Sequence, residues 1–248
     1  MPSPITFGAT SARSWGWSSG KKPVLPGTVG IFALGNCSYV TDKYVFSTGA
    51  NATTTSVGST RAGGAAGNST RGIFARGFFI KNRSKYTYAC DAVVSATSST
   101  PNVCGTYATG NSTRGIFALG NTGCGPRATT EKYTYSTDTS ASATSLTRCT
   151  AMGSAAGNST KGIFALSYNC GYSPTTTRNK YTYACDTVAG AASSSSAGAA
   201  GAAAGTSSVG IFALGCNGGQ IPALHHLTYA QKKAMQPEIQ LLEFLEWE

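Results

Sequence analysis

The acidic residues of this 248-residue chain are the first place to look for catalysis, and they are scarce. Residues 1–230 contain five of them: Asp42, Asp91, Glu131, Asp138 and Asp186. Asp91, Asp138 and Asp186 each stand six residues after the lysine of a recurring phrase. A position that recurs with a repeat indicates a structural role, so we expect these aspartates to cap turns through hydrogen bonds to the backbone. A carboxylate pair for glycoside hydrolysis stays open, although no spacing singles one out.

Histidine and nucleophile chemistry is equally limited. His225 and His226 are adjacent, and because neighbouring side chains on a strand point to opposite faces, they make a poor pair of metal ligands. A site that also includes Cys216 stays open. No serine or cysteine can be paired with a base by its spacing, and no phosphate-binding glycine loop precedes a helix. The sequence therefore predicts no catalytic residue, no metal and no cofactor, and a protein that is not an enzyme.

Eight cysteines raise the question of disulfides. Most of them hold repeat-linked positions after one of two recurring phrases: Cys37, Cys124, Cys170 and Cys216 after the first, and Cys90 and Cys185 after the second. Equivalent positions in neighbouring repeats usually lie farther apart than a disulfide allows. Buried free thiols are therefore the favoured state, with disulfides and a metal site as alternatives.

The elements that must position these residues are repeats. A phrase close to GIFALG begins at five positions, spaced 42, 43, 47 and 48 residues apart: Gly30, Gly72, Gly115, Gly162 and Gly210. A β-rich repeat with a period of about 40–50 residues is typical of a β-propeller. The unbroken apolar run predicts an inner strand buried on both faces, and the glycine at each end argues against a helix.

A second phrase, close to KYTY, follows each first phrase. It begins at Lys43, Lys85, Lys132 and Lys180, with a degenerate copy over Leu227–Ala230. Its alternation predicts a strand with one face towards solvent. Three first phrases are preceded by Gly-Asn-Ser-Thr, at Asn68, Asn111 and Asn158. These triplets match glycosylation acceptors, but their recurrence before each strand favours turn formation.

Five phrases predict an all-β fold, a five-bladed β-propeller over residues 1–230. The segment Ile5–Arg13, which precedes Trp15 and Trp17, is expected to complete the C-terminal blade and so to join the two ends of the ring. The small-residue tract 189–208 is expected to form outer strands and a loop. A single open solenoid is the alternative architecture.

Residues 231–248 form a separate tail that departs from the repeat. Gln236-Pro237-Glu238 predicts the start of a short amphipathic helix. Its apolar residues are candidates for docking to a partner: Ile239, Leu242, Phe244, Leu245 and Trp247. Packing of this helix on the closing blade of its own ring is the alternative, since so short a helix is marginal alone.

The net charge of +10 is concentrated in residues 1–230, which hold 17 Lys and Arg against 5 Asp and Glu. A basic surface suits nucleic acid, anionic glycans or an acidic protein, but charges that recur with the repeat are also typical of a solvated rim. We expect nucleic-acid binding least of these. No stretch is apolar enough to span a membrane, and no signal peptide is visible, so membrane insertion is not expected.

The phrases STRGIFALG and KYTY resemble a kelch-like family of propeller repeats found in bacterial and phage proteins, over Gly30 to Ala230. The chain lacks the Gly-Gly pair of ordinary kelch repeats, so the functions of kelch proteins are not transferred. The opening Ser3–Trp17 is similar to openings of phage tail and tail-fibre proteins. This second resemblance implies a virion-associated protein.

These observations together predict a non-enzymatic structural or binding component of a phage virion, made in the host cytoplasm. The loops, which differ most at Asn121–Thr130 and Tyr168–Asn179, would contact a host-surface glycan or other virion proteins. Association of several copies within an assembly is left open. The alternatives are a multivalent lectin-like propeller with one sugar site per blade and, further off, a glycan-degrading enzyme.

Overall fold

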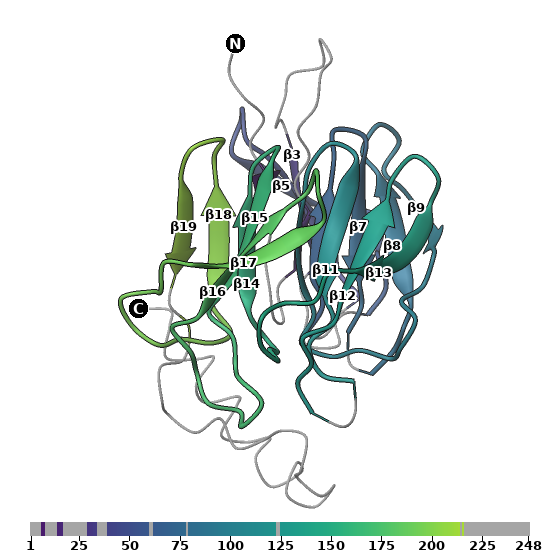
Figure 1. Ribbon diagram of the computed structural model, residues 1–248. Helices are drawn as coiled ribbons and strands as arrows, with labels where there is room; N and C mark the ends of the chain where they lie inside the picture. The colour runs from purple at the N-terminus through teal and green to yellow at the C-terminus, as the bar shows by residue number, and fades with distance from the viewer. Residues whose placement is uncertain are drawn as a thin grey trace, which may run out of the picture. The chain divides into compact units, whose positions relative to one another are not determined.

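The protein is described by a computed structural model that covers residues 6–7, 14–16, 29–33, 39–59, 62–77, 79–122, 125–213 and 215 (Figure 1). Every regular element among these residues is a β-strand, and every strand pairing is antiparallel. The all-β prediction is therefore confirmed. Among the described residues, no helix is long and apolar enough to cross a membrane.

The strands form five sheets, which are numbered here in the order of the repeats. Sheet 1 contains β2 to β5, at Ser14–Gly16, Val29–Ala33, Thr41–Val45 and Ala50–Thr53. Sheet 2 contains β6 to β9, at Gly64–Gly67, Arg71–Ala75, Arg83–Thr87 and Ala92–Ala96. Sheet 3 contains β10 to β13, at Tyr107–Gly110, Arg114–Ala118, Thr130–Thr134 and Thr139–Ala143.

Sheet 4 contains β14 to β17, at Ser154–Gly157, Lys161–Ala165, Arg178–Thr182 and Thr187–Ala191, and β1, at Thr6–Phe7, pairs with the edge of β14. Sheet 5 is described for β18 and β19, at Ala202–Gly205 and Gly210–Ala213. The tract 189–208 thus supplies part of an outer strand, a connection and the first strand of the next sheet, where outer strands and a loop were predicted.

The first strand of each sheet packs against the first strand of the next, from β2 through β6, β10 and β14 to β18. These strands consist largely of glycine and alanine because they approach one another closely. A methyl group added at Gly64 would lie 2.7 Å from the Cα of Tyr107 in the next sheet. The apolar phrase GIFA forms the second strand, one place outward from the innermost position.

The burial of the two phrases agrees with their patterns. Ile73 and Phe74, on opposite faces of β7, are both fully buried. On β8, Tyr86 is buried while Lys85 and Thr87 are half-exposed. The predictions of a doubly buried strand followed by an alternating strand are both confirmed in sheets 2 and 3, whereas β19, the same phrase in sheet 5, is largely exposed.

Neighbouring sheets meet through two unlike faces, and we call each contact a joint. Ile73 and Ala75 of sheet 2 lie in one cluster with Phe117, Tyr133 and Tyr135 of sheet 3. The same pattern joins sheets 3 and 4 through Ile116, Ala118, Phe164, Tyr181 and Tyr183, and sheets 1 and 2 through Ile31, Ala33, Phe74 and Tyr86. Each joint therefore packs an isoleucine face against an aromatic face.

A repeated polar link crosses each of these joints. The amine of Lys85 pairs with the Asp138 carboxylate of the next sheet, and the Tyr133 hydroxyl donates to the same carboxylate. Lys43, Asp91 and Tyr86 repeat this arrangement, as do Lys132, Asp186 and Tyr181. The aspartates are structural, as expected. They do not act mainly as caps of their own turns. Each aspartate pairs with a lysine of the preceding sheet and accepts a hydrogen bond from a tyrosine of its own sheet.

The Asn-Ser-Thr triplets build turns, as predicted. Asn111 Oδ1 accepts hydrogen bonds from the amides of Thr113, at 2.9 Å, and Arg114, at 3.0 Å. Its Nδ2 donates to the carbonyl of Ser159 in the next sheet, at 3.2 Å, and Asn68 and Asn158 repeat both contacts. A glycan on this nitrogen would remove a link between sheets.

The predicted closure by the N-terminal segment is not confirmed. β1 pairs with β14, the first strand of sheet 4, through Thr6–Gly157 and Phe7–Ala156. The small residues of β14 leave room for another backbone at this edge, whereas β18 pairs with β19 among the described residues. A division of the chain into two units falls after residue 217. The predicted boundary at 230, the C-terminal helix and the docking residues Ile239 to Trp247 lie outside the described residues.

The ion pair between Arg83 and Glu131 provides a test of the joint between sheets 2 and 3. Their atoms Nη2 and Oε2 lie 2.7 Å apart, and both side chains are almost fully buried. Glu131→Ala is expected to lower the free energy of unfolding by about 3–5 kcal/mol, because it leaves the guanidinium buried without its counter-charge. Asp42→Ala changes the same register position in sheet 1, where the side chain is half-buried, and should cost less than about 1 kcal/mol. Equal losses in urea denaturation would contradict this account.

The aspartates of the polar links predict acid sensitivity. Burial opposes ionisation of Asp138, but hydrogen bonds from Lys85 and Tyr133 outweigh it and lower its pKa to about 2. The pKa of Asp186 is lowered to about 2 in the same way by Tyr181, Thr144 and Lys132. An aspartate in the unfolded chain has a pKa of about 3.9. The contribution of Asp138 and Asp186 to the free energy of unfolding is therefore complete above about pH 4 and is lost as the pH falls towards about 2.

Urea midpoints measured from pH 5 to pH 2 should therefore fall steeply below about pH 4. Asp138→Asn should be less stable than the natural chain at pH 7 and should show a shallower decline with acid. A variant whose acid profile matches that of the natural chain would show that the link does not contribute.

Candidate binding surface

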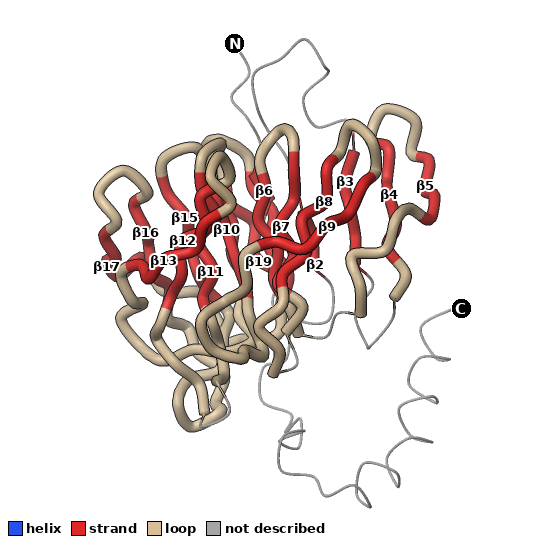
Figure 2. The backbone as a smooth tube through the Cα atoms, turned by 90° about the vertical axis from the view of Figure 1, so that its right-hand side faces the viewer, coloured by secondary structure: helices blue, strands red, loops and turns tan. Residues whose placement is uncertain are grey.

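The sheets have two ends of different character. The turn end holds short connections of nearly constant length, at 46–49, 68–70, 88–91, 111–113, 135–138, 158–160, 183–186 and 206–209. The loop end holds the other described connections, at 39–40, 54–59, 62–63, 76–77, 79–82, 97–106, 119–122, 125–129, 144–153, 166–177 and 192–201, and is the lower end in Figure 2. The second-to-third strand loops of sheets 2, 3 and 4 have 7, 11 and 12 residues. Variation between repeats is thus confined mainly to one end.

Backbone bridges tie the loops of neighbouring sheets together. Arg127 pairs with Thr150, and Ala151 pairs with Tyr168. Cys104 pairs with Asn121, and Thr175 pairs with Gly198 at the side of sheet 5. The loop end is therefore a connected backbone network, and its side chains are held at fixed positions relative to one another.

The loop of sheet 4 departs most from the repeat because its phrase ends in serine. Gly77 and Gly120 end the phrase in sheets 2 and 3 with φ values of 65° and 64°. Ser167 takes that position in sheet 4, and the left-handed conformation moves to Leu166, with φ of 52°. The chain therefore leaves β15 along a different path.

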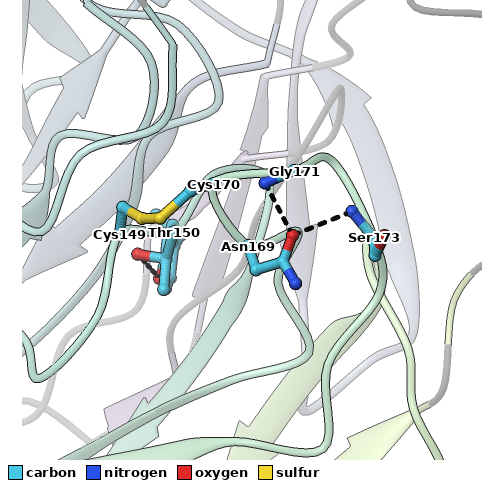
Figure 3. Close-up of a disulfide and its surroundings, with 7 residues drawn as sticks. Cys149, Thr150, Asn169, Cys170, Gly171 and Ser173 are labelled. Atoms are coloured by element: carbon cyan, nitrogen blue, oxygen red, sulfur yellow. Dashed lines mark hydrogen bonds between the residues drawn. A yellow bond between two sulfur atoms is a disulfide. The ribbon is translucent and has the colours of Figure 1, made fainter.

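Two local devices fix this different path, and Figure 3 shows both. A disulfide joins Cys149, before β14, to Cys170 in the loop, with their Cα atoms 5.4 Å apart. The Asn169 Oδ1 atom accepts hydrogen bonds from the amides of Gly171, at 2.8 Å, and Ser173, at 3.1 Å. The prediction of free thiols is wrong for this pair, because the two cysteines hold non-equivalent positions within one repeat rather than equivalent positions in two.

Tyr172 stands at the tip of the stapled loop. Its side chain is 40% exposed, and its φ of 57° is uncommon for a residue with a side chain. The Asn121 Nδ2 atom donates to the Tyr172 hydroxyl at 2.9 Å, which connects the loop of sheet 4 to that of sheet 3. An aromatic ring is thereby held at the surface between two loops.

The charge of the loop end is positive. Lys81, Arg127 and Arg148 are exposed and enter none of the ion pairs found among the described residues. The Arg127 Nε atom donates to the Thr122 hydroxyl at 3.3 Å, which orients the guanidinium. The aspartates of the polar links lie at the turn end, and Glu131 is buried against Arg83. The surface therefore offers cations and an aromatic ring to a ligand.

The predicted chemistry-bearing residues do not come together. Asp91, Asp138 and Asp186 stand at three successive joints, and Asp42 accepts a hydrogen bond from Asn51 at 3.2 Å. No group of three or more His, Cys, Asp or Glu is arranged to hold a metal within the described part of the chain. His225, His226 and Cys216 lie outside it. The free cysteines Cys90 and Cys185 are exposed, where buried thiols were predicted.

The loops Asn121–Thr130 and Tyr168–Asn179, predicted to carry recognition, both reach the loop end. Sequence reasoning did not single out Arg127, Arg148 or Tyr172 within or beside them. These three residues have no equivalent in the other repeats, and that difference is the sequence signal by which they could have been found. The disulfide had no such signal, because Cys149 belongs to neither recurring phrase.

Comparison with known proteins defines the fold alone. No protein-family description matches the sequence, and no curated protein matches it. Among the solved structures, 117 chains match, and one of them is the structure of YjhT. It covers 82% of this chain and 70% of its own, with a TM-score of 0.52 and 12% sequence identity. At this identity the likeness supports a shared arrangement of β-sheets and nothing about activity.

The disulfide provides a test of the stapled loop. Cys149 and Cys170 are separated by 21 residues, so replacing both with serine is expected to cost about 3 kcal/mol of unfolding free energy. Hydrogen exchange at the amides of Gly171 and Ser173 should become faster, since Asn169 no longer sits on a fixed loop. Cys90→Ser/Cys185→Ser removes two unpaired thiols and serves as the control. Unchanged exchange at these amides would show that Asn169 alone holds the loop.

Proposed function

We propose that the protein is a non-enzymatic binding component of a phage virion, that its five sheets are the blades of a β-propeller, and that its loop end makes the recognising contacts. The observation that carries the proposal is the confinement of variation to the loop end. The strands, joints and turns repeat closely, while the loops differ in length, charge and covalent linkage. Recognition commonly resides in variable loops on a constant scaffold.

The acidic residues favour binding over catalysis, because each described carboxylate already has a partner. Each of the five described carboxylates has a partner in the scaffold: a lysine, an arginine or an asparagine side chain. A glycosidase requires two carboxylates facing one substrate, and the scaffold already occupies these groups. Because the loops differ in length, they favour one binding surface formed by several loops over five equal sugar sites.

The virion assignment rests on the resemblance of Ser3–Trp17 to phage tail proteins. The disulfide between Cys149 and Cys170 supports it, because structural disulfides are typical of proteins that work outside a reducing cytosol. Exposed Lys81, Arg127 and Arg148 favour a partner that carries negative charge, such as a host-surface glycan or an acidic patch on a neighbouring virion protein.

Binding of alginate, an anionic polysaccharide, tests the recognising end, with neutral dextran as the comparison. Arg127→Ala/Arg148→Ala is expected to weaken alginate binding about tenfold or more, equal to about 1.4 kcal/mol. Lys161→Ala/Lys180→Ala removes the same charge from other parts of the surface and should change affinity less than about twofold. Equal losses for the two variants would show non-specific attraction to net charge.

The virion assignment needs a separate measurement. Antibodies against this chain should label intact particles released from lysed cells of the strain that encodes it. Immunogold electron microscopy should place the label on the tail or fibres. Particles in which neither labelling nor mass spectrometry detects the chain would overturn the virion assignment. The alginate experiment would still test the binding surface independently.

A further inference from the structure

Two exposed arginines are held together by backbone on the loops that follow sheets 2 and 3. Arg127 pairs with Thr150 through an antiparallel bridge, in which the Thr150 amide donates to the Arg127 carbonyl at 3.0 Å. Arg148 lies two residues before Thr150 and directly precedes Cys149. The bridge therefore brings the two guanidinium groups to one region of the loop end.

The disulfide brings an aromatic residue to the same region. It holds the Cα atoms of Cys149 and Cys170 5.4 Å apart (Figure 3). Arg148 is the neighbour of the first cysteine, and Tyr172 lies two residues beyond the second. Tyr172 and Arg148 are thus connected through a covalent link as well as through the chain.

A hydrogen bond connects Tyr172 to the other arginine. Its hydroxyl accepts from Asn121 Nδ2 at 2.9 Å. Asn121 pairs through a backbone bridge with Pro126, which directly precedes Arg127. These links join Arg127, Arg148 and Tyr172 into one group, which we call the loop cluster.

The loop cluster combines an apolar ring with cations. Tyr172 is 40% exposed, and because Asn121 occupies its hydroxyl, the ring is the part that it offers to a ligand. Neither arginine belongs to an ion pair within the described part of the chain. A guanidinium presents a planar fork of N–H donors that matches the two oxygens of a carboxylate. A ligand that fits the cluster therefore has a rigid C–H surface beside a carboxylate.

A pyranose ring that carries a carboxyl group has both features. One of its faces is lined by C–H groups and stacks on an aromatic ring, while the carboxylate projects from the edge of the sugar. An acidic peptide carries its carboxylates on flexible side chains and has no rigid apolar face. Such a peptide would use the arginines and leave the tyrosine ring without a role.

We propose that the loop cluster binds a uronic-acid unit of an acidic polysaccharide, with Tyr172 stacked on the sugar ring and Arg127 and Arg148 contacting carboxylates. This inference rests on the proposed function of the loop end and names the ligand class of that surface. The disulfide and the Asn121 hydrogen bond hold the ring in place before the ligand arrives, so less conformational entropy is lost on binding.

Three polymers separate the two features of this ligand. Alginate has carboxylated pyranose rings, poly-L-glutamate has carboxylates without sugar rings, and dextran has sugar rings without charge. Tyr172→Ala is expected to weaken alginate binding about tenfold because stacking is lost, and to change poly-L-glutamate binding less than about twofold. Tyr172→Phe keeps the ring and loses only the hydroxyl, so its affinity for alginate should stay within about threefold of that of the natural chain.

Tyr39→Ala is the matched control. Tyr39 is 70% exposed in the loop of sheet 1, at the same end of the sheets, and lies outside the loop cluster. This variant should bind all three polymers like the natural chain. Arg127→Ala/Arg148→Ala should lose affinity for alginate and for poly-L-glutamate alike. Thermal melts monitored by circular dichroism check that each variant is folded.

Saturation-transfer NMR gives a measurement that does not depend on a loss of affinity. Saturation of aromatic protons should reach the ring protons of an alginate oligosaccharide in the natural chain, in Tyr39→Ala and in Tyr172→Phe. It should disappear in Tyr172→Ala. Transfer that persists in Tyr172→Ala would contradict the stacking.

The outcomes distinguish this inference from the proposal on which it rests. If Tyr172→Ala binds alginate like the natural chain, the stacking site is overturned and charge-based recognition at the loop end stands. An equal loss for alginate and poly-L-glutamate in this variant also overturns it, because the tyrosine then only shapes the loop. A natural chain that binds poly-L-glutamate but not alginate would identify an acidic protein as the partner. Binding of neither polymer would overturn both proposals.

Discussion

The packing of an isoleucine face against an aromatic face is the contact on which the rest of the structure depends. Each sheet is a single layer, and in sheets 2, 4 and 5 its first strand consists almost entirely of glycine and alanine. Such a sheet cannot bury its second strand by itself. Stacking removes Ile73 and Ile116 from water on one side and Phe117 and Phe164 on the other. Because the two faces differ, the sheets add in one direction only, and the order of the repeats in the chain becomes their order in space.

Polar groups in the joints fix how neighbouring sheets are aligned, which apolar packing alone does not determine. At the Asp138 carboxylate, a lysine of the preceding sheet and a tyrosine of the same sheet both donate hydrogen bonds. These two bonds offset the cost of burying the carboxylate. At the turn end, the asparagine of each triplet adds a bond to the next sheet. Asp91, Glu131, Asp138 and Asp186 are thus committed to holding neighbouring sheets together. This commitment supports the proposal that the molecule is a scaffold for binding.

The loop end takes no part in the apolar joints or in the lysine–aspartate links. Its backbone bridges hold the loops in place, so their side chains can vary without loss of the joints. In sheet 4 the replacement of a glycine by Ser167 redirects the chain, and a disulfide and Asn169 then fix the new path. Tyr172 owes its position to these local changes, whereas the Arg127 guanidinium is oriented by Thr122 in the loop of sheet 3. The surface can therefore be specific although the scaffold is repetitive.

The sequence by itself determined the strands, because periodic phrases report burial directly: GIFA is apolar on both faces and KYTY alternates. It also indicated the structural role of the aspartates and which loops vary. Tertiary structure alone decided that β1 joins sheet 4, that Cys149 meets Cys170, and that Asp138 receives Lys85 from another sheet. Each of these is a contact between residues far apart in the chain or in non-equivalent repeat positions. A pattern along the sequence describes the environment of a residue, whereas the identity of its partner depends on how the sheets stack.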